Sequence, residues 1–132
     1  MKIGLDTSVV LRLIIGEPAA QTKLAQRRVA LALSAGAEIL VSDLVAAEAF
    51  HALHHHYGIP KEEARAQLRA MLISGVVAID PPEALGAFEP SRGAGLADRL
   101  IVARHRALGA STWTFDRKLG TIEGVERLSL ER

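Results

Sequence analysis

The feature of this sequence that most constrains its fold is the alternation of short apolar segments with longer helical patterns. Most of the apolar segments end at Asp, Ser or Pro, which are residues that begin a helix or a turn. Strands that alternate with helices form a parallel sheet covered by helices on both faces. The predicted strands are residues 2–5, 38–41, 76–79, 112–115 and about 127–130, and the predicted helices are residues 9–15, 19–35, 44–57, 60–74, 83–88 and 96–108.

Composition narrows the class of protein. A chain of 132 residues with 49% hydrophobic and only 4% aromatic residues has the size of one domain and predicts an aliphatic core, so we expect a single domain over residues 1–132. The absence of cysteine excludes disulfides, thiolate metal sites and a cysteine nucleophile. A net charge of +1 gives no global field toward nucleic acid or membrane. With no apolar run near the ~20 residues of a membrane helix, and with Asp6 interrupting any leader, we expect a soluble, cytoplasmic protein.

Two aspartates occupy equivalent positions, because Asp6 and Asp116 each come directly after a predicted strand. In an open parallel sheet the carboxyl ends of the strands line the ligand crevice, which makes both residues candidates for a site. The alternative is that each caps the following helix or forms a local Asx-turn.

Two further acids are candidates for the same site. Asp98 begins the 96–108 helix, where the ordinary role of an aspartate is to cap the helix. Glu48 has Leu44, Val45 and Ala52 as its helical neighbours, which predicts a carboxylate on an apolar face that needs a partner.

Carboxylates gathered at one crevice repel one another, and a divalent cation removes that repulsion. Oxygen ligands without cysteine favour Mg²⁺ or Mn²⁺ over Zn²⁺. Thr114 lies two residues before Asp116 in the strand and therefore faces the same side, where its hydroxyl is predicted to donate a hydrogen bond to a carboxylate.

Four motifs in order resemble those of the PIN-domain ribonucleases, and the length and spacing of the chain resemble the VapC-type toxins of type II toxin–antitoxin systems. The motifs are Leu5-Asp6-Thr7-Ser8, the helical Glu48, Leu96-Ala97-Asp98 and Thr114-Phe115-Asp116-Arg117. The resemblance covers residues 1 to about 130. It implies a three-layer PIN-like α/β fold, with a central, mostly parallel sheet, and hydrolysis of RNA phosphodiester bonds with Mg²⁺ or Mn²⁺.

The resemblance also implies roles for individual residues and partners. It implies an acidic quartet that is both catalytic and metal-binding, formed by Asp6, Glu48, Asp98 and Asp116, with Thr114 and nearby Thr7 or Ser8 as positioning hydroxyls. Its implied partners are an RNA substrate, a cognate antitoxin protein and a second copy of the chain in a homodimer. The 9–15 helix supports the expectation of a protein partner. It is apolar around nearly its whole circumference, and such a helix is either deeply buried or covered by a partner. Arg99 departs from the family pattern, and we expect it to pair with an acid or reach a phosphate.

Other classes of protein fit the sequence less well. A receiver-like phosphoacceptor domain has a related architecture, but it needs paired acids after the first strand, where Asp6 stands alone. A phosphatase of the Asp-x-Asp-x-Thr kind is excluded by Ser8. A non-catalytic binding module gives no reason for Glu48 on an apolar face. A PIN-fold RNA-processing nuclease without an antitoxin stays open.

Two weaker patterns have ordinary explanations. Glu48, His51 and His55 share a helix face in the manner of a metal site, but histidines at a helix C-terminus usually form a solvated end that suits the dipole. Gly93-x-Gly95 lacks the third glycine of a dinucleotide fingerprint, whose position is taken by Asp98.

Overall fold

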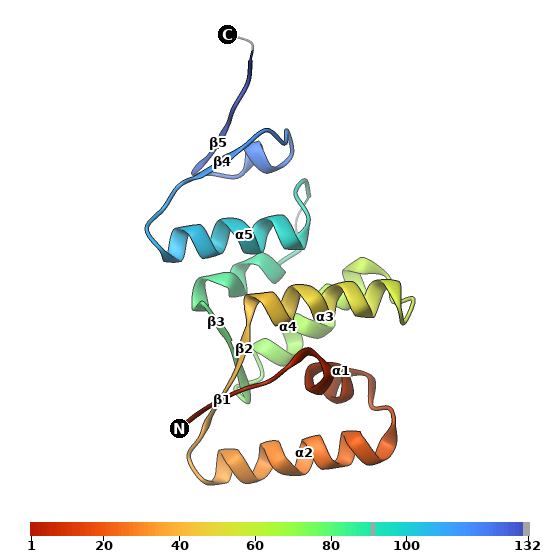
Figure 1. The fold of residues 1–132 in the computed structure, drawn as a ribbon. Coiled ribbons are helices and arrows are strands. Elements are labelled where there is room, and N and C mark those ends of the chain that lie inside the picture. Colours follow the sequence, from red (N-terminus) through yellow and green to blue (C-terminus); the bar gives the residue numbers. More distant parts are fainter. Residues whose placement is uncertain (91, 131–132) are drawn as a thin grey trace.

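The computed structural model of the protein describes residues 1–90 and 92–130. The predicted strands and helices occur in the predicted order, and the structure adds a short 3-10 helix at Leu119–Thr121 (Figure 1). The strands are β1 (Lys2–Gly4), β2 (Glu38–Ser42), β3 (Val77–Asp80), β4 (Thr112–Thr114) and β5 (Val125–Arg127). The α-helices are α1 (Thr7–Ile15), α2 (Ala19–Ser34), α3 (Asp43–His55), α4 (Lys61–Leu72) and α5 (Leu96–Ala107), and the 3-10 helices are η1 (Pro82–Phe88) and η2 (Leu119–Thr121).

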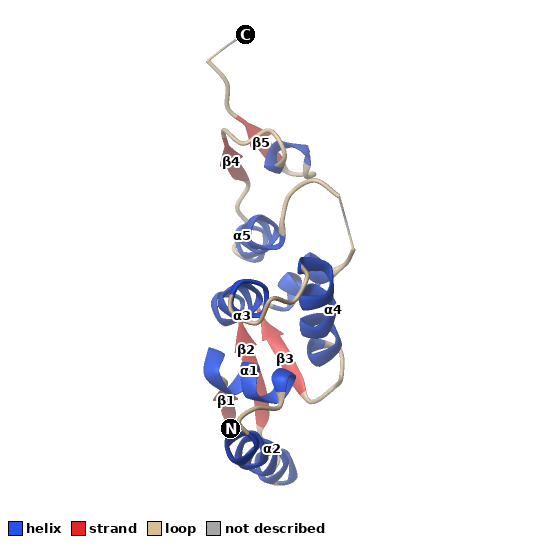
Figure 2. Ribbon diagram, turned by 90° about the vertical axis from the view of Figure 1, so that its right-hand side faces the viewer, coloured by secondary structure: helices blue, strands red, loops and turns tan. Residues whose placement is uncertain are grey.

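All strand pairs in the described chain are parallel, and helices surround them, which confirms the predicted α/β class and is consistent with a PIN-like fold (Figure 2). One sheet has the order β1-β2-β3, with Ile3 opposite Ile39 and Val41 opposite Ile79. Strands β4 and β5 form a second, two-stranded sheet instead of joining the first. The predicted sheet is therefore divided into two parts.

Local chemistry sets most of the element boundaries. The side chain of Ser42 accepts a hydrogen bond from the Val45 amide at 3.1 Å and begins α3. Gly16, with φ +83°, ends α1 in a left-handed conformation that favours glycine. Strand β5 begins at Val125, two residues earlier than predicted, because Val125 packs against a small buried cluster next to α5.

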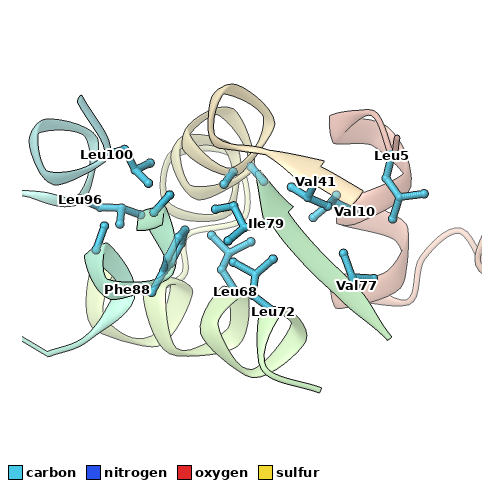
Figure 3. Close-up of a cluster of buried hydrophobic side chains, with 14 of the residues drawn as sticks. Leu5, Val10, Val41, Leu68, Leu72, Val77, Ile79, Phe88, Leu96 and Leu100 are labelled. Atoms are coloured by element: carbon cyan, nitrogen blue, oxygen red, sulfur yellow. The ribbon is translucent and has the colours of Figure 1, made fainter. Parts of the chain in front are cut away.

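The main core lies between the three-stranded sheet and the helices around it (Figure 3). Most of its members are aliphatic, as the composition predicts, and Phe88 is the aromatic side chain among the largest fully buried ones. On α5, Leu96, Leu100 and Ala103 pack into this core. The core therefore extends from α1 to one face of α5.

A second, smaller cluster lies on the other side of α5. It is formed by Ala94, Val102 and Leu119, with Ile122 and Val125 packed against it. We call residues 112–130 the C-terminal arm. The arm lies beyond α5, on the side of that helix away from β1, β2 and β3 (Figures 1 and 2).

None of the helices in residues 1–90 and 92–130 has the length and apolar character needed to cross a membrane.

Candidate active site

The structure brings two of the four predicted acids together at the carboxyl end of β1. Asp6 is the N-cap residue of α1, but its side chain makes no capping hydrogen bond and is exposed. Thr7, the next residue, is buried and donates its hydroxyl hydrogen bond to the Glu48 carboxylate of α3. Contact between α1 and α3 thus brings Glu48 against Thr7, the residue that follows Asp6, and the Thr7 hydroxyl fixes one of the Glu48 oxygens.

The face of α3 that carries Glu48 lies at the surface of the protein. Leu44 is 76% exposed, Val45 and Ala52 are half-buried, and Glu48 itself is exposed. The predicted apolar neighbours are therefore present, although they leave the Glu48 side chain open to solvent. The partner that we expected for this carboxylate is the Thr7 hydroxyl.

Asp116 lies in the C-terminal arm and forms a local turn. Its Oδ1 accepts hydrogen bonds from the amides of Lys118 at 2.7 Å and Leu119 at 3.3 Å, which is the Asx-turn alternative considered for this residue. The hydroxyl oxygen of Thr114 accepts a hydrogen bond from the Asp116 amide at 3.0 Å. Thr114 therefore contacts the backbone of Asp116, and its predicted bond to a carboxylate stays a prediction.

Asp98 is the third residue of α5, and the N-cap position belongs to Gly95 instead. The ordinary explanation of Asp98 as an N-cap is therefore wrong, because its side chain lies inside the first turn and makes no capping bond. Arg99 donates hydrogen bonds to the carbonyls of Ala94 at 3.0 Å and Arg92 at 2.8 Å. The expectation that Arg99 pairs with an acid is also wrong, because its guanidinium holds the loop that precedes α5.

The quartet is thus divided in the same way as the sheet. Asp6 and Glu48 lie beside the three-stranded sheet, whereas Asp98 lies on α5 and Asp116 on the arm. Within residues 1–90 and 92–130, no three acids or histidines lie close enough to hold a metal ion. Ser8 lines an apolar groove between α1, β1 and α2. The quartet as a whole stays a prediction.

The two acids connected through Thr7 have the chemistry for a hard cation. Asp6 and Glu48 provide carboxylate oxygens, which are preferred ligands of Mg²⁺ and Mn²⁺. Mg²⁺ is commonly held by one or two carboxylates together with water and substrate oxygens. Asp6 and Glu48 therefore fit half of the predicted metal site.

The histidines at the end of α3 form no such site. The rings of His51 and His55 lie 4.2 Å apart, and His54 Nδ1 lies 2.8 Å from the Ile59 carbonyl oxygen. Local desolvation, followed by the charges of the neighbouring histidines, lowers the pKa of His55. Because His51, His55 and His56 are exposed at the helix end, the ordinary explanation of this cluster fits the structure.

An ion pair that the sequence did not reveal connects α3 to α5. Arg104 donates from Nε to Asp43 Oδ2 at 2.7 Å and from Nη2 to Asp43 Oδ1 at 2.8 Å. These hydrogen bonds lower the pKa of the buried Asp43 carboxyl, against the opposing effect of its burial, and raise the pKa of Arg104. A buried acid at the start of an apolar helix was a usable signal, because it needs a partner for the reason given for Glu48.

Comparison with known proteins identifies the family. A search of curated proteins gives no match for this chain. The family model of the PIN domain matches residues 3–125, a range that contains all four predicted acids. PIN domains have a nuclease-type fold and generally use divalent metal ions. With nearly the whole sequence matched and a mixed α/β structure with parallel strands, this chain belongs to the PIN-domain family.

Proposed function

We propose that this protein is a Mg²⁺- or Mn²⁺-dependent endoribonuclease that acts in the cytoplasm as the toxin of a toxin–antitoxin pair. The observation that carries the proposal is the arrangement at the end of β1. There the exposed Asp6, whose side chain makes no capping bond, directly precedes buried Thr7, whose hydroxyl donates to the Glu48 carboxylate. A carboxylate that serves only to begin a helix would bond to the amides of the first turn, and Asp6 does not.

In this proposal each residue of the site has its own role in binding the cation or in positioning a ligand. A bound divalent cation supplies Lewis acidity and neutralises the charge that develops on the phosphate. Asp6 and Glu48 bind the cation, Thr7 fixes the orientation of Glu48, and Asp98 and Asp116 complete the acidic site. Thr114 positions Asp116 through its contact with the Asp116 backbone.

The proposal of protein partners is supported by an apolar groove on the described part of the chain. Leu24 and Leu31 of α2 are more than half exposed beside the groove that α1, β1 and α2 form. An apolar groove of this kind suits an amphipathic segment of an antitoxin or part of a second copy of the chain in a homodimer.

The test of the enzymatic proposal is RNA cleavage by the purified protein. We expect cleavage with Mg²⁺ or Mn²⁺, loss of cleavage in excess EDTA, and loss in Asp6→Asn. The matched control is Glu62→Gln, which changes an exposed acid on α4 and should keep full activity. Full activity of the wild-type protein in EDTA would contradict metal dependence.

The toxin role has its own test. Expression of the wild-type chain should arrest growth, Asp6→Asn should not, and co-expression of the adjacent small gene should relieve the arrest. Harmless expression of a protein that cleaves RNA in vitro would favour an RNA-processing nuclease without an antitoxin. Phosphorylation by acetyl phosphate without RNA cleavage would favour a receiver-like domain, against the family match.

A further inference from the structure

Strand β1 is an open edge of the three-stranded sheet. Leu5 donates its amide to β2, and Met1 accepts a hydrogen bond from β2 with its carbonyl. Because bonding alternates along a parallel strand, the backbone groups of Lys2 and Gly4 point away from β2. No described strand pairs with that side of β1. The unpaired N–H and C=O groups of such an edge can pair with another strand.

An apolar groove lies beside this open edge. Its volume is about 930 Å³, and its lining includes Ile3 of β1, Leu5 directly after β1, Val9 of α1, and Leu24 and Val29 of α2. The groove is therefore large enough to hold bulky side chains carried by a strand that adds to β1.

The C-terminal arm has the complementary features. Strand β4 pairs with β5 on one side only, so its other edge is open in the described structure. Thr112 is buried toward α5, whereas Trp113 and Phe115 are 68% and 72% exposed. The arm thus presents a strand with one open edge together with two exposed aromatic side chains.

The sequences around the two open strands match in spacing. Strand β1 covers Lys2–Gly4 and is followed by one apolar residue and Asp6. Strand β4 covers Thr112–Thr114 and is followed by one apolar residue and Asp116. If β4 adds to β1 in parallel with the same register, Trp113 lies beside Ile3 and Asp116 lies beside Asp6. Neighbouring strands are about 4.8 Å apart, which brings the two carboxylates within reach of one cation.

The arm of the same chain does not reach β1 in this structure. Leu119 and Val125 of the arm pack with Val102 on the side of α5 away from the main core. His105 Nδ1 lies 2.8 Å from Thr112 Oγ1, and Arg106 donates a hydrogen bond to the Glu123 carbonyl. Folding the arm back onto its own β1 would break these contacts, whereas the arm of another copy can approach with them intact.

We propose that the open edge and groove beside β1 bind the C-terminal arm of a second copy of this chain. Strand β4 of one copy pairs in parallel with β1 of the other, and Trp113 and Phe115 fill the groove. The acidic site then combines Asp6 and Glu48 of one copy with Asp116 of the other. The last point rests on the proposed nuclease function, and the strand pairing does not.

Cross-linking tests the strand pairing without any use of activity. The chain has no cysteine, and a side chain added at Gly4 meets no atom within 4 Å. Gly4→Cys and Thr114→Cys, made in separate chains and mixed under mild oxidation, should form a disulfide between two chains, because the register places them opposite each other. The control pairs Thr114→Cys with Glu62→Cys on α4 and should give no comparable product. A disulfide that forms only within a chain carrying both cysteines would overturn the proposal, and so would the absence of any disulfide.

Light scattering tests the assembly itself. The wild-type protein should exceed the monomer mass of 14.1 kDa, and Trp113→Glu should return it to that mass. The control Ile73→Glu changes another exposed apolar residue, at the end of α4, and should keep the assembly. A wild-type protein that stays monomeric would overturn the proposal.

Mixing of inactive variants tests the shared site. Asp6→Asn and Asp116→Asn should each be inactive alone, whereas an equal mixture should regain about a quarter of the wild-type activity, since random pairing of chains unites two intact halves in that share of sites. If the wild-type protein cleaves RNA but the mixture of the two variants stays inactive, each site lies within one chain and the shared site is wrong. If the disulfide forms but the wild-type protein cleaves no RNA, the nuclease proposal fails and the strand pairing stands.

Discussion

Arg104 of α5 holds the buried Asp43 carboxylate of α3 through two parallel hydrogen bonds, at 2.7 and 2.8 Å. Asp43 lies five residues before Glu48 on α3, and Arg104 lies six residues after Asp98 on α5. This ion pair therefore sets the spacing between two helices that carry predicted site residues.

The first prediction concerns the pH dependence that this pair confers. Because the folded-state pKa of Asp43 is lowered, its contribution to stability is present above the unfolded pKa, near 3.8, and is lost as the pH falls through the folded value. Arg104→Gln should therefore lower the thermal midpoint at pH 7 more than at pH 3. The control Arg27→Gln removes an exposed cation from α2 and should shift both midpoints little. Equal losses at the two pH values would contradict this role of Asp43.

The second prediction concerns the main core. Phe88 is fully buried, and Phe88→Ala should lower the free energy of unfolding by about 3–5 kcal/mol, measured by denaturant titration, because it removes apolar contacts and leaves a cavity. Tyr57→Ala, which changes an exposed aromatic residue, is the control and should cost far less. Similar losses would mean that Phe88 is not a central core residue.

The third prediction concerns the hydroxyl that orients Glu48. Thr7→Val keeps the branched shape and removes one hydrogen bond to the carboxylate, so Mg²⁺ affinity should fall by about 10–100-fold without unfolding. Thr22→Val is the matched control, since Thr22 is also buried but donates to the Arg12 carbonyl instead of an acid. Calorimetric titration with Mg²⁺ measures both, and equal affinities would show that Thr7 serves the fold alone.

The fourth prediction separates charge from turn structure at Asp116. Asn keeps an oxygen that accepts the Lys118 and Leu119 amides, so Asp116→Asn should preserve the turn and the circular dichroism spectrum. It should nevertheless lose most RNA cleavage, because one carboxylate of the predicted site is gone. Asp98→Asn should behave alike. Retained cleavage in both variants would remove these residues from the site.

The sequence predicted what local chemistry determines. Alternation of apolar strands and helices predicted the parallel α/β class, and Asp6 lies at the end of β1 as expected. The four motifs resemble those of the PIN-domain family, which the comparison confirms. These features depend on residues close together in the chain.

Contacts between distant residues were harder to predict. Asp43 and Arg104 are 61 residues apart, and Arg99 bonds to loop carbonyls whose positions depend on the fold around α5. The pattern around Glu48 gave its apolar neighbours but not that Leu44 faces solvent, because helical spacing shows which residues share a face and not what covers it. The separation of β4 from β1 is likewise a matter of tertiary packing.

The division of the apolar interior into a large and a small cluster affects how the backbone opens to solvent over time. The arm packs against α5 through a small cluster of buried side chains, chiefly Val102 of α5 and Leu119 of the arm, whereas β2 and β3 lie in the main core. Local opening is cheapest where few apolar contacts are lost. Backbone amides of β4 and β5 should therefore exchange with deuterium much sooner than those of β2, and the protein would fluctuate between a complete fold and one whose last two strands have come apart.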